Sequence, residues 1–382
     1  MKHPIYLDYN ATTAVDERVI KAMLPYFNAH YGNPSSITHA FGWDAVEAIK
    51  VATTQIKSLI NCDEQELIYT SGATEAINLA IKGVWENYQF KGKHIITVKT
   101  EHKAVLDVCQ SLERQGATIT YLSVNSEGLI NLDELKSVIS DKTILVAVMY
   151  VNNETGVMQP IDEIAEIVHQ HKSIFMCDAT QAVGKISIDL STDKIDLMCM
   201  SAHKMYGPKG IGALYVRRKK PRVVLAPQIH GGGHQRGLRS GTLNVPGIVG
   251  LGKACEIAKT EMDADKKRIS ALHNFFESSI ATLNGVYING SQSKRIYTTS
   301  NITLKGINSA KLISKIPQLA ISMGSACSAA NTSPSHVLKA MQLSDEDAFS
   351  TIRVSIGKHT TGEQIDEAIH SLSKQIKANS AS

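Results

Sequence analysis

Two polar side chains that follow strand-like runs in the middle of the chain are suited to bind one cofactor. Asp178 follows the apolar run Ile174 to Cys177, and Lys204 comes soon after the run Ile195 to Met200. The carboxyl ends of parallel strands meet at one edge of a sheet, where ligands bind. Pyridoxal phosphate needs such a pair, a lysine amine for a covalent bond and a carboxylate beside its ring nitrogen. A lone lysine is usually a surface charge, but the glycines and proline of SAHKMYGPKG (201–210) favour a turn at a site.

A small-residue turn earlier in the chain is suited to bind a phosphate. The segment TSGATE (70–75) follows a strand-like run and precedes a helix-like pattern. The first N–H groups of a helix have no partner within the helix, and together with the helix dipole they attract anions. The alternative is that Ser71 or Thr74 is a plain N-cap, and the residues alone leave both interpretations open.

Cys327 lies among small residues, in GSACSAA (324–330). A free cysteine is usually a small buried hydrophobic residue, but these neighbours are too small to form a core. We therefore interpret Cys327 as an exposed thiol, which suits a mobile nucleophile.

Arg353 lies within the apolar alternation IRVS (352–355), which is typical of a strand. An arginine on a strand that points into a site can bind a carboxylate with two parallel hydrogen bonds. The alternative is a surface arginine on an edge strand.

Metal chemistry is the competing interpretation, and the histidine spacings do not favour it. His169 and His171 lie at a polar helix end, and His230 and His234 flank three glycines, so neither pair presents the i, i+4 helical face that binds zinc. The six cysteines form no CxxC pair, which argues against disulfides and a zinc knuckle. We expect no metal, and the one alternative left open is Cys327 as an iron–sulfur ligand.

The elements that position these residues alternate between strands and helices from about residue 65 to 216. This alternation predicts an α/β fold with a mostly parallel sheet covered by helices on both faces. The predicted strands are 67–70, 95–98, 119–122, 144–150, 174–177, 195–200 and 211–216, and the predicted helices are 74–88, 102–115, 132–139 and 161–172.

The pattern changes after about residue 260. A charged helical stretch from Glu261 to Leu283 precedes scattered strands at 296–304, 319–322 and 351–355 and a final helix at 361–376. We predict a large cofactor-binding domain of residues 14–260 and a smaller α+β domain of residues 1–13 and 261–382, which carries Cys327 and Arg353.

Composition excludes several classes of protein. The 382 residues are 43% hydrophobic and 20% charged, and 40 Lys and Arg against 36 Asp and Glu give a net charge of +4. Disorder and small disulfide scaffolds are excluded, and so small a charge does not argue for nucleic acid. The longest apolar run, 144–151, is far short of the ~20 residues that cross a bilayer, and the N-terminus has no apolar signal region. We expect a cytoplasmic protein that contacts neither membrane nor nucleic acid directly.

Taken together, these segments resemble the cysteine desulfurases of the class V aminotransferase family, the NifS/IscS-like group. The resemblance covers nearly the whole chain. It rests on eight motifs in family order: GNPSS (32–36), TSGATEA (70–76), TEHKAVLD (100–107), VNNETG (151–156), DATQAVGK (178–185), SAHKMYGPKGIGALYVRR (201–218), HGGGHQRGLRSGTLN (230–244) and GSACSA (324–329).

The resemblance implies a fold-type I transferase and gives the cofactor contacts. Lys204 would bind pyridoxal 5′-phosphate covalently, and Asp178 would pair with its ring nitrogen. His102 would stack on the ring and relay protons, and Gln181 would donate to the phenolic oxygen. The remaining cofactor-binding residues implied are Ala73, Thr74, Asn153, Ser201, His203 and Thr242 of the partner subunit.

The resemblance also implies the substrate contacts and the reaction. Arg353, with Asn33 and Asn153, would bind the carboxylate of L-cysteine. Cys327 would accept the sulfur as a persulfide and alanine would be released. The partners implied are a second copy of the chain, in a homodimer with shared active sites, and a sulfur-acceptor protein that serves iron–sulfur clusters, thio-nucleosides or DNA phosphorothioate.

Two alternatives stay open from the sequence. The first is another pyridoxal-phosphate reaction on the same fold, such as that of a selenocysteine lyase or a small-amino-acid aminotransferase. An aminotransferase has no use for Cys327. The second is a non-catalytic scaffold that kept the fold, which the presence of Lys204, Asp178 and Cys327 disfavours.

Overall fold

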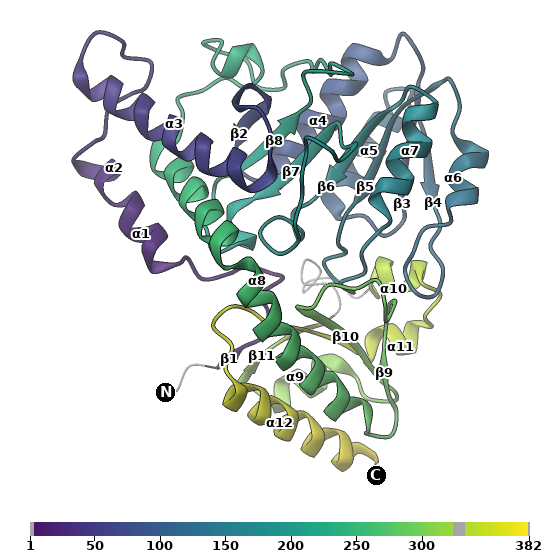
Figure 1. The fold of residues 1–382 in the computed structure, drawn as a ribbon. Helices are drawn as coiled ribbons and strands as arrows, with labels where there is room; N and C mark the ends of the chain where they lie inside the picture. Colours follow the sequence, from purple (N-terminus) through teal and green to yellow (C-terminus); the bar gives the residue numbers. More distant parts are fainter. Residues whose placement is uncertain (1–3, 324–332, 381–382) are drawn as a thin grey trace.

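The computed structural model describes residues 4–323 and 333–380, so Cys327 lies outside the described residues. Within the described residues, no helix is long and apolar enough to span a membrane. The chain forms a large seven-stranded sheet with helices on both faces, and a smaller four-stranded sheet lies below it in Figure 1.

The larger sheet is mostly parallel, as predicted. Its strands β7, β6, β5, β3 and β4 pair in parallel, whereas β8 is antiparallel to both β7 and β2. All of the predicted strands are present, with ends close to those predicted. In spatial order they are β2 (Leu67–Thr70), β8 (Gly212–Val216), β7 (Leu197–Ser201), β6 (Ile174–Asp178), β5 (Thr143–Met149), β3 (His94–Val98) and β4 (Thr118–Leu122).

Helices bury both faces of this sheet. Along β5, Leu145 and Ala147 pack in the core that α4 and α5 cover, whereas Val146 and Val148 pack in the core on the other face. This is why β5 has no polar alternation and is buried at every position. The helices of this part of the chain are α1 (Glu17–Met23), α2 (Pro25–Asn28), α3 (Ala40–Ile60), α4 (Ala73–Tyr88), α5 (Lys103–Glu113), α6 (Leu132–Val138) and α7 (Ile161–Gln170).

The smaller sheet is antiparallel, and a separate pair of short strands lies beside it. Its order is β12, β13, β10, β9, while β1 pairs in parallel with β11. The single strand predicted at 319–322 is therefore two short strands in different sheets. The elements of this part are β1 (Ile5–Tyr6), β9 (Val286–Ile288), β10 (Thr299–Leu304), α9 (Ser309–Lys315), β11 (Leu319–Ala320), β12 (Ser322–Met323), α10 (His336–Ala340), α11 (Asp345–Phe349), β13 (Thr351–Ser355) and α12 (Gly362–Ser380).

One long helix connects the two parts (Figure 1). The helix that we predicted from Glu261 begins earlier, so that α8 spans Val245–Ala281. Its first half packs against α3 in the core of the larger sheet, and its second half packs in the core of the smaller sheet through Phe276 and Ile280. The apolar spacing in its glycine-rich first half is too weak to reveal a helix. The domain boundary at residue 260, which falls inside α8, stays a prediction.

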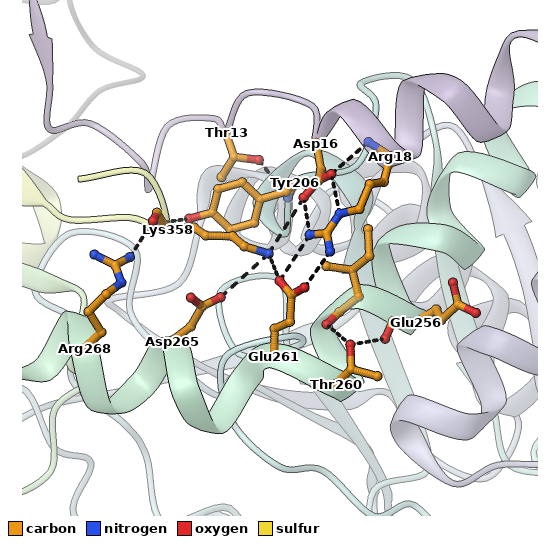
Figure 2. Close-up of polar contacts among 11 residues, drawn as sticks. Thr13, Asp16, Arg18, Tyr206, Glu256, Thr260, Glu261, Asp265, Arg268 and Lys358 are labelled. Atoms are coloured by element: carbon orange, nitrogen blue, oxygen red, sulfur yellow. Dashed lines mark hydrogen bonds and ion pairs between the residues drawn. The ribbon is translucent and has the colours of Figure 1, made fainter. Parts of the chain in front are cut away.

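A cluster of charged side chains joins three separate segments where the two parts meet (Figure 2). We call it the Lys358 cluster. Lys358, in the loop after β13, contacts the carboxylates of Glu261 and Asp265 on α8 and of Asp16 before α1. Arg18 pairs with both Asp16, at 2.8 Å, and Glu261, at 2.5 Å.

The Lys358 cluster also reaches the turn that carries Lys204. The backbone N–H of Lys358 donates to the Tyr206 hydroxyl at 2.6 Å. The backbone N–H of Tyr206 in turn donates to Thr13 Oγ1 at 2.8 Å. Arg18, then Lys358, lowers the pKa of Glu261 to about 2, against the unfavourable effect of burial. The Glu261 carboxylate therefore contributes stability above pH ~4.5, the ordinary pKa of Glu, and this contribution is lost as the pH falls toward 2.

We expect Lys358→Met to destabilise the fold because it leaves three carboxylates facing one another without their shared cation. The free energy of unfolding should fall by about 1–3 kcal/mol, measured by urea denaturation at pH 7. Lys219→Met is the matched control, because Lys219 is 79% exposed in its pair with Asp63, and it should cost less than about 0.5 kcal/mol. Equal losses in the two variants would show that the Lys358 cluster contributes no more than a surface pair.

Candidate active site

A cavity of about 580 Å³ opens at the carboxyl ends of β6 and β7, between the two sheets. It also contains the N-terminus of α4 and one side chain from β13. Asn33 and Thr242 are exposed and do not line the cavity that one chain forms. The predicted site residues that line it are Ala73, Thr74, His102, Asn153, Asp178, Gln181, Ser201, His203, Lys204 and Arg353.

Lys204 lies in the short 3₁₀ turn 202–204 that follows β7. Its Nζ donates to the backbone carbonyl of Asn10 at 2.6 Å and to that of Ala11 at 2.7 Å. The N-terminal segment is held there because the N–H of Thr13 donates to the His203 carbonyl at 2.9 Å. Two carbonyls thus fix the amine at the cavity wall. Sequence reasoning missed Asn10 and Ala11, since backbone acceptors leave no side-chain signal.

Asp178 is the last residue of β6 and is buried beneath the cavity. Its Oδ1 accepts hydrogen bonds from the backbone N–H of Thr180, at 3.0 Å, and from its hydroxyl, at 2.5 Å. These bonds fix the orientation of the carboxylate and leave Oδ2 for another donor. Because β6 and β7 pair in parallel, with Asp178 opposite Cys199, the carboxylate and the turn of Lys204 lie at the same edge.

The N-terminus of α4 opens into the same cavity without a side-chain cap. Its N-cap is Gly72, so neither Ser71 nor Thr74 is the cap. The first helical bond runs from Ala76 N to the Gly72 carbonyl, so the preceding N–H groups are not used within the helix. The adjacent strand comes very close, since a Cβ on Gly212 would lie 2.8 Å from the Gly72 Cα. The turn and strand together make a tight cradle for an anion.

Two histidines of the cavity are held in defined states. The His102 ring caps α5, and its Nδ1 accepts from Ala104 N at 3.1 Å, so the proton of the neutral ring is on Nε2. Burial lowers the pKa of His203, and together with the charges of Lys204, Lys209 and Lys185 it brings the pKa to about 4. His203 is therefore neutral at pH 7.

Arg353 is nearly fully buried on β13, between β12 and β10. It is therefore not a surface arginine on an edge strand. One of its terminal nitrogens donates to the Asn153 carbonyl at 3.0 Å, and the other forms an ion pair with Asp8 at 2.7 Å. Asp8 Oδ1 also accepts from the Ser322 hydroxyl at 3.0 Å. These contacts hold the guanidinium at the cavity. Asp8 is a further site neighbour that sequence reasoning did not identify.

Comparison with known proteins agrees with this geometry. The family model described as aminotransferase class-V matches residues 5–368. The chain belongs to this family. A curated relative, cysteine desulfurase IscS of Histophilus somni (strain 129Pt), is 53% identical over 371 residues, which cover 97% of this chain and 92% of the relative.

Two solved structures similar to this class-V aminotransferase chain share its fold over most of their length. One is described as a NifS-like protein, with a TM-score of 0.91 and 34% identity, covering 98% of this chain and 99% of the other. The second, described as SspA in complex with cysteine, has a TM-score of 0.83 and 38% identity, covering 93% of this chain and 99% of the other.

The cavity fits pyridoxal phosphate, the cofactor of this family. The uncapped N-terminus of α4 suits its phosphate, Lys204 Nζ supplies the amine, and the Asp178 carboxylate can meet a ring nitrogen. Glu75 is the acidic residue nearest the cradle in sequence, and Arg239 neutralises it at 2.7 Å. Among the described residues, no group of three His, Cys, Asp or Glu side chains is placed to hold a metal ion.

Glu154 is a buried acid behind Arg353. Burial raises the pKa of Glu154 to about 7, although the Ser335 hydroxyl and the charges of Arg353 and His102 act in the opposite direction. Ser335 Oγ donates to Glu154 Oε2 at 2.5 Å. A carboxyl group with a raised pKa favours the folded state in its protonated form. Its contribution to stability is complete below pH ~4.5 and is lost as the pH rises through about 7.

We expect Glu154→Gln to remove the loss of stability at high pH, because the amide keeps an acceptor for Ser335 and cannot ionise. At pH 8 the variant should be more stable than the original chain by about 1–3 kcal/mol, with a smaller difference at pH 5. Thermal or urea denaturation across pH 5–8 measures this. The exposed Glu163 on α7 provides the control Glu163→Gln, which should follow the original chain. Parallel curves for Glu154→Gln would contradict the raised pKa.

Proposed function

We propose that the chain is a pyridoxal-phosphate-dependent cysteine desulfurase, which converts L-cysteine to L-alanine and passes the sulfur to Cys327 as a persulfide. The observation that carries the proposal is that one cavity gathers Lys204, Asp178, the open N-terminus of α4 and Arg353. The naming of the relative from Histophilus somni and the cysteine complex of SspA support the substrate.

The chain's residues would hold the cofactor in a defined orientation. Lys204 Nζ would form the covalent bond and Asp178 would bind the ring nitrogen. The phosphate would lie at the N–H groups of Ala73 and Thr74, and Ser201 and the neutral His203 would donate to it. When bound, pyridoxal phosphate delocalises the electron pair left as the Cα–H bond of the substrate breaks.

Other residues would bind the substrate and move its proton and sulfur. Arg353 would bind the carboxylate, with Asn153 beside it. Lys204 Nζ, released when the substrate amine takes its place, would take the α-proton, and His102 would exchange protons through Nε2. The Cys327 thiolate would then attack the substrate sulfur, so that the new S–S bond forms as the Cβ–S bond breaks.

A second copy of the chain would complete the site. Asn33 and Thr242 are exposed and lie outside the cavity of one chain. Large apolar side chains on and beside α1 to α3 are also exposed, including Leu24, Phe27 and Trp43. A homodimer would cover these side chains, and Thr242 of the partner subunit would complete the phosphate site. The sulfur acceptor would be a separate protein, of iron–sulfur, tRNA-thiolation or DNA-phosphorothioation type, in the cytoplasm.

Incubation with L-cysteine without reductant tests the reaction directly. The expected products are alanine and a one-sulfur mass increase on the peptide that carries Cys327. Cys327→Ala should lose both while the cofactor stays bound. Cys62→Ala is the matched control, because burial raises the pKa of the Cys62 thiol to about 12 and keeps it unreactive, so this variant should keep both products. Alanine without the persulfide would indicate a lyase, and neither product would favour a scaffold.

The assignment of the covalent bond is tested with borohydride, which traps the cofactor on its lysine. We expect the label on Lys204 in the original chain and no covalent label in Lys204→Ala, because the amine is then absent. Lys209→Ala removes a second amine that lines the same cavity and should keep the label on Lys204. A label on any other lysine in the original chain would overturn the assignment. Mass spectrometry of the peptides gives the result.

A further inference from the structure

A second lysine lies behind the cavity and contacts one of its polar side chains. Lys185 Nζ donates to Gln181 Oε1 at 2.8 Å. Gln181 lines the cavity and is itself buried, whereas Lys185 does not line the cavity. The reaction proposed above has no use for Lys185. Its position therefore calls for another explanation.

Donor and acceptor chemistry makes Lys185 an orienting group. When protonated, a lysine amine only donates hydrogen bonds. Burial lowers the pKa of Lys185 to about 7, and its charged form selects the oxygen of the Gln181 amide. On the other side of this amide, Nε2 donates to the Asn10 carbonyl at 2.9 Å. A flipped amide would place a donor against a donor at Lys185 and two oxygens together at Asn10, so the two contacts favour the same orientation.

The Gln181 contacts lead directly to Lys204. The Asn10 carbonyl that accepts from Gln181 also accepts from Lys204 Nζ at 2.6 Å. An amide nitrogen carries two N–H groups, and in the described part of the chain the second N–H of Gln181 meets no acceptor. Gln181 thus presents a hydrogen-bond donor to the cavity. It shares one acceptor, the Asn10 carbonyl, with Lys204, the lysine that would bind the cofactor covalently.

We propose that Lys185 is a positioning residue that holds the Gln181 amide with its nitrogen toward the phenolic oxygen of the bound cofactor. This inference rests on the proposed function for the role of Lys204, and on the role of Gln181 that the resemblance implies. A donor to that oxygen stabilises its negative charge. Lys185 would therefore affect the protonation of the covalent link without touching the cofactor.

Charge is the competing way for Lys185 to act. Lys204 is the charged group that faces Lys185. Both lysines, together with Lys209, lower the pKa of His203. A cation at Lys185 would disfavour a proton on the Lys204 nitrogen directly, without Gln181. The experiment must therefore separate an effect that passes through the Gln181 amide from one that does not.

The test is a pH titration of the visible absorption of the cofactor-loaded protein. Lys185→Met should raise the midpoint by about half to one pH unit, the size of one weakened hydrogen bond, because the phenolic oxygen loses a well-placed donor. Gln181→Ala should raise it at least as much, and the double variant should match Gln181→Ala. Lys185→Arg, which keeps donor and charge, should keep the original midpoint.

Two results would overturn the proposal. The first is an unchanged midpoint in Lys185→Met. The second is that Lys185→Met raises the midpoint as much in the Gln181→Ala background as in the original chain, because the charge of Lys185 alone would then explain the shift. If Lys185→Met does not fold, Lys185→Gln keeps a donor without the charge and should keep the original midpoint, and a raised midpoint there would also overturn the proposal. Borohydride labelling of Lys204 in the original chain reports separately on the proposed function.

Discussion

The site depends on the parallel pairing of β6 with β7. This register places the last residue of β6, Asp178, beside the turn that carries Lys204. An antiparallel neighbour would put these groups at opposite ends of the sheet. Parallel strands of this kind are stable when helices bury both faces of the sheet. The apolar residues of β6 and β7, which pack in the cores on both faces, therefore also fix the relative positions of Asp178 and Lys204.

The smaller sheet adds what the larger one cannot supply. Arg353 comes from β13, and the N-terminal segment runs from β1, beside the smaller sheet, to Lys204. Asp8 contacts Arg353, and the Asn10 carbonyl contacts Lys204. A short segment thus contacts both charged groups that the reaction needs. The Lys358 cluster reinforces this junction from the other side of the Lys204 turn, through Tyr206.

Much of the larger sheet could be predicted from the sequence because its strands are short β-branched runs between amphipathic helices. The positions of Asp178 and Lys204 followed from strand ends alone. Helices α1 to α3 escaped prediction, since their exposed apolar residues blur the contrast between faces, as at Phe41 and Trp43. The contact of Asp8 with Arg353 could not be predicted, because no local pattern links residues that far apart. The assignment of Asn33 and Thr242 to the site rests on the resemblance alone.

The ion pair between Asp8 and Arg353 joins residues 345 positions apart. Contacts of such sequence separation form late in folding, because a very long loop must close before they add stability. During synthesis, Asp8 leaves the ribosome long before Arg353, its partner on β13. The pocket therefore cannot take its final form until β13 has been made, and a polypeptide that stops before β13 would have an incomplete binding site for cofactor and substrate.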